Sequence, residues 1–354
     1  MLLITHGWEK NHFGGRQQYS KCLSKALKKC EIKNFEIYKI DPYKKENLYK
    51  KLFNLNMDHI TDEDTNNILK LIFKKNISTI IIDCSSFGKI CKKIKNSKNK
   101  INIIVVYHHI ESSFFLKYFF NSFKFKYIYI SIKMFINEFL SSKYSNKQIF
   151  FTKRDFFYGK FFYKAKNGHI FPIAQDIEYE NDDLENTNIL HKPYMLFVGG
   201  ANLLPNLKGI IWFLKKVIPF VDLNFVVVGS GYENVIKNNN KKVFFLGKVD
   251  NLQPLYQNCE FVVAPIFSGS GMKTKVAEAS GFGKMVFGTK EALTGYENFI
   301  NVNSILCNNA NEFKKNIDNY KTKINKKENV LEIFKKNYSI ESMKNNYSNI
   351  IKQF

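Results

Sequence analysis

The stretch that decides the fold, Phe261–Glu297, reads FVVAPIFSGSGMKTKVAEASGFGKMVFGTKEALTGYE. It opens with an apolar, β-branched run at Phe261–Ile266 and continues through the turn Ser268-Gly269-Ser270-Gly271. A helix-compatible segment follows at Met272–Ser280. This order predicts a buried parallel strand, then a glycine-rich turn, then the start of a helix.

The predicted turn has the features of an anion site. Glycines let the backbone approach a ligand closely, and the free N–H groups at a helix N-terminus carry a partial positive charge. Lys273 and Lys275 add mobile positive charge, and the Glu278 carboxylate lies further along the helix, where it could accept hydrogen bonds from sugar hydroxyls. Phosphate at the turn and ribose at the carboxylate suggest a nucleotide, and a purely structural turn is the alternative.

The order of elements around this turn resembles the nucleotide-sugar-binding half of a GT-B glycosyltransferase of family 4, the retaining glycosyl transferases group 1. The resemblance runs from Tyr194 to about Glu297 and rests on three segments in the same order: YMLFVGGANLLPNLKGIIWFLKKVIPF, LNFVVVGSGYE and VFFLGKVDNLQPLYQNCEFVVAPIFSGSGMKTKVAEA. It implies an α/β fold with two Rossmann-like parallel-sheet domains facing a cleft, and a C-terminal helix that crosses back to the first domain.

The chain has 354 residues, enough for two domains of roughly 150 residues each. The amino-terminal half alternates helix-compatible segments with predicted strands at Leu2–Thr5, Phe35–Ile40, Thr79–Asp83 and Ile101–Tyr107, which is typical of a parallel α/β sheet. With the resemblance, we expect an acceptor-side domain at 1–177, a polar linker at 178–193, a nucleotide-sugar-binding domain at 194–335 and a crossover helix at 336–354.

The resemblance also assigns roles to residues of the second domain. Lys208 matches the lysine that grips the donor diphosphate in retaining relatives, whereas Asn202 stands near the place of its partner arginine, so that Lys273 or Arg16 would substitute. Glu278 matches the glutamate that holds the ribose, but Ser270 replaces the one that contacts the donor sugar. The expected donor-binding residues are Gly14, Gly15, Arg16, Gly200, Asn202, Gly229, Gly231, Ser268, Gly269, Ser270, Gly271, Met272, Lys275 and Glu278, and the expected catalytic residues are His108, Lys208 and Lys273.

In the first domain the resemblance points to two strand ends. A loop with Gly14 and Gly15 precedes a predicted helix, where backbone N–H groups could approach a phosphate or an acceptor; a structural turn is the alternative. The strand Ile101–Tyr107 ends in His108-His109-Ile110-Glu111, which resembles the family pattern H-[DN]-x-E and places His108 at the site. Arg16 and Arg154 are the only arginines in the sequence, so these positions suggest a need for a planar bidentate donor. Arg154 is either a surface ion-pair residue or a site residue.

The net charge of +23 favours anionic partners, although part of the lysine excess reflects a compositional bias. No motif of a nucleic-acid-binding module is present, so the charge favours an anionic membrane surface over nucleic acid. The segment 112–145 is rich in Phe and Lys. The sequence favours a helix that packs its Phe residues inward there, and a membrane interface is the alternative.

Other sequence features limit the function. The six cysteines form no C-x-x-C pair and have no His partner at metal-ligand spacing, so they predict neither a disulfide framework nor a metal site. No apolar run approaches the ~18–20 residues that span a bilayer, and no signal-peptide pattern follows Met1. We therefore expect a cytoplasmic protein, with possible peripheral contact at the inner face of the membrane.

The resemblance implies transfer of a hexose-type sugar from a nucleoside diphosphate, of the UDP or GDP type, to an acceptor hydroxyl. The resemblance implies retention of configuration, no metal and no other cofactor, a glycan or lipid-linked acceptor, and a place in bacterial-type surface polysaccharide or glycolipid synthesis. A GT-B sugar-nucleotide epimerase and a non-catalytic nucleotide- or glycan-binding protein are the alternatives.

Overall fold

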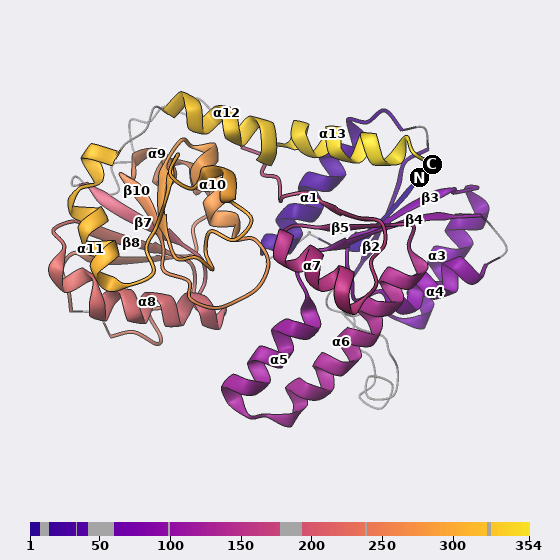
Figure 1. Ribbon diagram of the computed structural model, residues 1–354, viewed down its shortest axis with the longest axis horizontal. Coiled ribbons are helices and arrows are strands. Elements are labelled where there is room, and N and C mark those ends of the chain that lie inside the picture. The colour runs from indigo at the N-terminus through magenta and orange to yellow at the C-terminus, as the bar shows by residue number, and fades with distance from the viewer. Residues whose placement is uncertain are drawn as a thin grey trace. The chain divides into compact units, whose positions relative to one another are not determined.

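A computed structural model describes residues 1–7, 14–32, 34–41, 60–97, 100–177, 193–237, 239–323 and 327–354. The chain forms two compact units, which are Met1–Ala174 together with Ile340–Phe354, and Gln175–Ser339. Within the described residues each unit contains a six-stranded sheet (Figure 1), and the strand pairs are parallel. The α/β class with two parallel sheets, expected from the sequence, is confirmed.

Unit 1 is built on the strand order β2-β1-β3-β4-β5-β6. Its central strands are runs of Ile and Val with nearly every side chain buried, as expected for parallel strands covered on both faces. The elements of unit 1 are β1 (Leu2–His6), α1 (Gly15–Lys28), β2 (Glu36–Ile40), α3 (Asp62–Lys74), β3 (Thr79–Ile82), α4 (Gly88–Asn96), β4 (Asn102–Tyr107), α5 (Glu111–Ser122), α6 (Phe125–Tyr144), β5 (Lys147–Phe150), α7 (Lys153–Phe162), β6 (Gly168–Ile170) and, from the end of the chain, α13 (Ile340–Ile351).

Unit 2 has the strand order β12-β11-β10-β7-β8-β9. Its elements are β7 (Tyr194–Val198), α8 (Leu204–Lys216), the 3₁₀ turn η2 (Ile218–Phe220), β8 (Asn224–Val228), β9 (Val243–Gly247), α9 (Gln253–Asn258), β10 (Phe261–Ala264), α10 (Thr274–Gly281), β11 (Met285–Gly288), η3 (Glu297–Phe299), β12 (Ser304–Leu306), α11 (Ala310–Asp318), η4 (Tyr320–Lys323) and α12 (Lys327–Tyr338).

The carboxyl end of the chain forms two helices instead of one. α12 belongs to unit 2, and α13 belongs to unit 1. α13 packs on α1, where the hydroxyls of Tyr347 and Tyr19 lie 2.8 Å apart. Gln175 pairs with Ser339 where the two connecting segments run side by side. Of the expected linker 178–193, all but Pro193 lies outside the described residues, so the linker stays a prediction.

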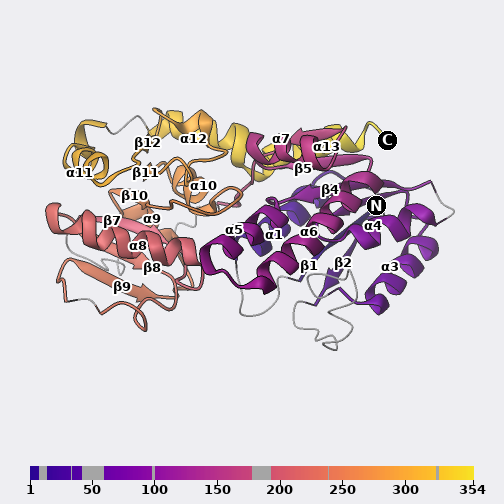
Figure 2. The ribbon, with the colours of Figure 1, turned by 60° about the horizontal axis from the view of Figure 1, so that its bottom comes forward.

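The aromatic segment 112–145 forms the helical hairpin α5–α6, whose two helices lie side by side (Figure 1, Figure 2). The sequence favoured a helix that packs its Phe residues inward, and this expectation is wrong at the turn of the hairpin. Phe120, Phe123 and Phe125 are mostly exposed, because the hairpin buries only the residues that face its partner helix or α4.

Candidate functional site

The strand order of unit 2 creates a topological switch point between β7 and β10. From β7 the chain moves through α8 to β8 on one side, and it later returns to pair β10 with the other side of β7. Ligands of open parallel sheets bind where the strand order reverses, at the carboxyl ends of the strands. Three loops lie at these ends, 199–203, 229–232 and 265–273, and we call them the switch-point loops.

Glycines allow the backbones of the switch-point loops to pack closely. Gly199 and Gly229 have φ angles of +146° and +137°, which residues other than glycine rarely adopt. A Cβ on Gly229 would lie 2.5 Å from the carbonyl carbon and oxygen of Gly199. A Cβ on Gly199 would lie 2.7 Å from Asn206 Nδ2 and 3.0 Å from Lys275 Nζ. The first loop therefore lies directly over the amide and the ammonium group.

The side chain of Lys275 is buried beneath these loops. Its Nζ donates to Asn206 Oδ1 at 3.0 Å and lies 3.8 Å from the centroid of the Phe197 ring. Asn206 Nδ2 in turn donates to the Gly200 carbonyl at 3.0 Å. Burial lowers the pKa of Lys275 to about 7, a shift that the nearby Glu278 opposes. The sequence predicted mobile charge here, and this was wrong because Asn206 and Phe197 hold the side chain in place.

Two helices begin at the same switch point without side-chain caps. α8 follows β7 and α10 follows the loop after β10, and neither carries an acidic residue in its first turn. Their first N–H groups thus keep the partial positive charge of a helix N-terminus. The Lys275–Asn206 hydrogen bond joins the two helix starts. The two N-termini and the buried lysine together favour an anion.

The glycine-rich loop before α10 is held by its own lysine. Lys273 Nζ donates to the carbonyls of Ser270 at 3.2 Å and Gly271 at 2.9 Å, and it pairs with Glu291 Oε1 at 3.1 Å. Gly269 and Gly271 have φ angles of +140° and +61°. The charge of Lys273 is therefore fixed on this loop, which corrects the sequence expectation that it is mobile.

Glu278 lies on α10 with its carboxylate buried in unit 2. The Tyr256 hydroxyl donates to Glu278 Oε2 at 2.6 Å, and burial followed by the charge of Glu278 raises the pKa of Tyr256 well above its usual value. This tyrosine orients the carboxylate. Its position in the short helix α9 gave no functional signal in the sequence.

The remaining expected residues of unit 2 lie around the same loops. Met272 packs over Gly295, because a Cβ there would come within 2.6 Å of Met272 Cγ. Asn202, Ser268 and Lys208 are exposed, and Gly231 has a φ of +94°. Lys208 lies on α8 one residue before Gly209, whose backbone packs against the Pro265 carbonyl.

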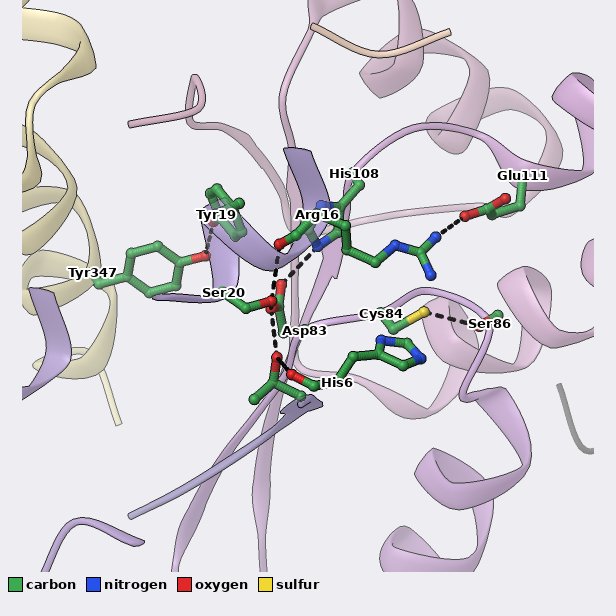
Figure 3. Close-up of polar contacts among 11 residues, drawn as sticks. His6, Arg16, Tyr19, Ser20, Asp83, Cys84, Ser86, His108, Glu111 and Tyr347 are labelled. Carbon is green, nitrogen blue, oxygen red and sulfur yellow. Dashed lines mark hydrogen bonds and ion pairs between the residues drawn. The ribbon is translucent and has the colours of Figure 1, made fainter. Parts of the chain in front are cut away.

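Unit 1 contains a polar cluster at its own switch point, between β1 and β3. Asp83 is fully buried and accepts hydrogen bonds from Thr5 Oγ1 at 2.9 Å and from Ser20 Oγ, both on Oδ2. His108 Nε2 lies 2.7 Å from Asp83 Oδ1. Figure 3 shows Asp83 between Ser20 and His108. We call these four residues the Asp83 cluster.

The Asp83 cluster fixes the orientation of His108. Because an ionised carboxylate only accepts, His108 Nε2 is the donor in this contact with Asp83. Edge contacts with Tyr19 and Phe151 hold the ring from its sides. His108 was predicted from the sequence, whereas Asp83 was recognised only as the end of a strand.

A second charged group in unit 1 surrounds Glu111. Arg16 Nη2 pairs with Glu111 Oε1, and His109 Nε2 lies 3.1 Å from Glu111 Oε2. Burial opposes ionisation of Glu111, but the charges of His109 and Arg16 outweigh it and hold its pKa well below the usual range. Burial likewise opposes the charged form of His109, and the Glu111 carboxylate reverses this and raises its pKa. Arg16 therefore forms an ion pair with a carboxylate of its own unit.

Gly14, Gly15 and Arg154 are exposed, whereas Arg16 is half-buried. Gly14 and Gly15 are exposed at the start of α1, and the Gly14 N–H donates to Gln17 Oε1 at 3.2 Å. Arg154 is more exposed than Arg16, and its Nε lies 3.8 Å from Asp155 Oδ1. The backbone at Gly14 and Gly15 is accessible, as an approach by a ligand would require.

Glu138 supports the Glu111 group from α6. Its carboxylate accepts from the backbone N–H groups of Glu111 at 2.8 Å and Ser112 at 3.1 Å, and from the Tyr163 hydroxyl at 2.7 Å. It thus caps the N-terminus of α5, and burial raises its pKa to about 7. The sequence gave no signal for this residue, because Glu138 stands 27 positions after Glu111 in the chain.

Two features are absent from the described parts of the chain. No group of three or more His, Cys, Asp or Glu side chains there could hold a metal ion. None of the helices in those same parts is long and apolar enough to cross a membrane.

Comparison with known proteins gives a partial sequence match. Residues 192–321 match the family model of glycosyl transferases group 1. A protein from Klebsiella pneumoniae, described as an uncharacterized 44.6 kDa protein in the cps region, is 28% identical over 169 residues. That match covers 43% of this chain and 42% of the relative, so it spans less than half of either protein.

Solved structures match almost the whole chain. Sucrose-phosphate synthase from Thermosynechococcus elongatus is 16% identical, with a TM-score of 0.76, over 99% of this chain and 98% of its own. HepE of Anabaena, in complex with UDP and glucose, is 12% identical, with a TM-score of 0.69, over 100% and 99%. At these identities the likeness shows the fold. The chain has the GT-B fold of glycosyltransferases, and residues 192–321 carry the sequence pattern of glycosyl transferases group 1.

Proposed function

We propose that this protein is a glycosyltransferase that moves a sugar from a nucleoside diphosphate to an acceptor hydroxyl. The observation that carries the proposal is the meeting of two uncapped helix N-termini with the buried Lys275 at the switch point of unit 2. A diphosphate is the ligand whose charge fits this arrangement. The family match over residues 192–321 supports the reaction class.

The proposed donor is a UDP- or GDP-type sugar nucleotide. The solved complex of HepE with UDP and glucose, which shares the fold, supports this choice. The N–H groups of α8 and α10 would bind the diphosphate, and Lys275 would add positive charge beside them. Lys208 and Lys273 would stabilise the diphosphate as it departs. Glu278, held by Tyr256, would accept hydrogen bonds from the ribose.

The proposed reaction keeps the anomeric configuration and needs no metal ion. The bond from the sugar C1 to the diphosphate oxygen breaks, and the acceptor oxygen bonds to C1 on the same face. The acceptor proton passes to the departing diphosphate. Lysines and helix N-termini would stabilise the negative charge of that leaving group, which is electrostatic catalysis. We assign the Asp83 cluster of unit 1 to the transfer step, through His108.

We further propose a glycan or lipid-linked acceptor and a role in surface polysaccharide or glycolipid synthesis, at an anionic membrane surface. The partial match to a protein in the cps region of Klebsiella pneumoniae supports the pathway, and the Lys-rich sequence supports the membrane surface.

The test is product analysis with purified full-length protein, UDP- and GDP-hexoses, and extracted bacterial glycolipids as acceptors. We expect release of nucleoside diphosphate and a glycosylated product only when both substrates are present, an unchanged rate in EDTA, and an anomeric NMR signal that matches the donor. Conversion of the donor without acceptor would identify an epimerase. Nucleotide binding without any turnover would identify a binding protein.

Matched variants connect the activity to the site. Lys275→Met removes the buried charge, and Lys216→Met removes an exposed lysine at the far end of α8. We expect the first variant to lose most of the transfer rate and the second to keep it. Equal rates in the two variants would contradict the proposed site.

A further inference from the structure

The turn of the α5–α6 hairpin exposes three phenylalanines, Phe120, Phe123 and Phe125, which we call the hairpin tip. Their exposed fractions are 61%, 74% and 78%. All three rings lie around the ring of Phe119, with centroid distances of 5.4, 6.2 and 5.8 Å. Large apolar side chains that gather on a surface indicate a binding site when they form one patch.

The apolar surface continues along α6. Phe125, Tyr129, Ile132 and Ile136 are exposed and recur every three or four residues, so they lie on one face of the helix. A helix in a globular protein normally turns such a stripe towards its core. The core-facing side of α6 instead carries Ser131, Met134 and other buried residues, and the stripe faces outward.

The backbone at the hairpin tip gives an independent observation. Phe123 ends α5 in the left-handed conformation, with φ of +50°, and its N–H donates to the Phe119 carbonyl at 2.7 Å. Glycine or asparagine occupies this position at lower cost, and a bulky residue there is an outlier. Because Phe123 is largely exposed, packing within the protein does not offset that cost.

The charge around the hairpin tip is positive. Lys117, Lys124 and Lys126 are exposed next to these phenylalanines. The sequence contains no Asp or Glu from 112 to 137. Lysines beside exposed aromatic rings match a bilayer with anionic headgroups, because rings enter the headgroup region while lysines reach lipid phosphates.

We propose that the hairpin tip and the α6 stripe form a docking surface that inserts into an anionic lipid bilayer. The turn lies at the end of the two helices away from the unit 1 sheet (Figure 1). This inference deepens the proposed function, on which its biological purpose rests. Binding to lipid is measured without donor or acceptor, so the two ideas fail separately.

The test is flotation of the full-length protein with two kinds of vesicle. One is phosphatidylcholine alone, and the other is two parts phosphatidylcholine to one part phosphatidylglycerol. We expect the wild type to float with the anionic vesicles and to detach in high salt. Phe123→Ser/Phe125→Ser should weaken binding at least roughly tenfold. Lys124→Glu/Lys126→Glu should weaken it at least roughly 30-fold.

The control variant is Phe73→Ser, which removes a half-exposed phenylalanine from α3 in the same unit. It should bind anionic vesicles like the wild type. Circular dichroism and transfer activity with a water-soluble acceptor check that every variant is folded.

Three results would overturn the docking surface. The first is that the wild type does not bind anionic vesicles. The second is that the wild type and Phe123→Ser/Phe125→Ser bind them equally. The third is that the wild type is a dimer and that this double variant converts it to a monomer without changing lipid binding. The last result would show that a second copy of the chain covers the hairpin tip. A wild-type protein that binds anionic vesicles but transfers no sugar would count against the proposed function alone.

Discussion

Replacing the buried lysine of unit 2 by methionine should change how stability depends on pH. The pKa of Lys275 falls from its ordinary value of 10.5 to about 7 on folding, because burial penalises the charged form. Between these two values the unfolded chain binds more protons at this side chain than the folded chain does. The free energy of unfolding therefore rises with pH through this window and falls as pH drops towards 7.

The size of the effect follows from the shift. Each pH unit inside the window changes the free energy of unfolding by up to about 1.4 kcal/mol, so two units from about pH 7 to about pH 9 give at most about 3 kcal/mol. Methionine keeps the apolar stem against Phe197 but leaves Asn206 Oδ1 without its donor, which costs about 1–3 kcal/mol at any pH. Only the first contribution varies with pH.

The assay is urea unfolding of wild type, Lys275→Met and Lys216→Met at several pH values. Trp212 reports on unit 2, because its ring packs against Phe267 and Phe313, and a Trp8→Phe background removes the other tryptophan. We expect the stability difference between wild type and Lys275→Met to grow by up to about 3 kcal/mol with rising pH. Parallel pH profiles for these two proteins would refute the account of Lys275.

Three other predictions concern Glu278, the Asp83 cluster and the switch-point loops. Glu278→Ala should weaken nucleotide binding in calorimetry and cost about 1–3 kcal/mol of stability, because the Tyr256 hydroxyl loses its acceptor. Glu278→Gln should keep the stability of the wild type. Equal stability losses in the two variants would contradict the contact between Tyr256 and Glu278. Asp83→Asn and His108→Ala should lower turnover by up to about 100-fold while donor affinity changes little, since the first disturbs the orientation of the His108 imidazole and the second removes that ring. A matching loss of donor affinity would argue against this role of His108. Gly229→Ala should lower nucleotide affinity and destabilise unit 2 by roughly 1–3 kcal/mol, as thermal unfolding would show, because its Cβ meets backbone atoms; an unperturbed variant would contradict the close packing of the loops.

The fold was predictable because parallel strands and their turns leave local signals. The predicted strands Phe35–Ile40 and Ile101–Tyr107 form β2 and β4, each of which begins one residue later than predicted. The strand after Phe261 ends at Ala264 instead of Ile266, and the following helix starts at Thr274 instead of Met272, because the glycine-rich loop takes residues from both. Such boundaries depend on loop packing, which the hydrophobic pattern does not encode.

Residues of the candidate site could be predicted only where a histidine or a glycine turn directly follows a predicted strand. His108 and the glycine turns were found in this way. The partners that hold the functional groups were not, because Asn206 and Asp83 act through contacts with residues distant in sequence. Burial of Lys275 was equally invisible, since a lysine in a predicted first helical turn is normally exposed.

The exposure of the phenylalanines at the α5–α6 turn was also not predictable from the sequence. A run rich in Phe predicts burial, and Phe114 and Phe119 are indeed partly covered. Phe123 and Phe125 lie at the turn, where neither helix nor sheet can cover them. Which face of a hairpin meets the core depends on its neighbours in space.

The most direct test of the central claim is thermal unfolding with a panel of UDP, GDP, ADP and CMP, on wild type, Lys275→Met and Lys216→Met. A bound nucleotide at 100 times its dissociation constant stabilises the folded state by about 2.7 kcal/mol. We predict that one nucleoside diphosphate raises the melting temperature of the wild type and of Lys216→Met, and raises that of Lys275→Met far less. Equal stabilisation of all three proteins, or stabilisation by none of the nucleotides, would contradict a diphosphate site at the switch-point loops.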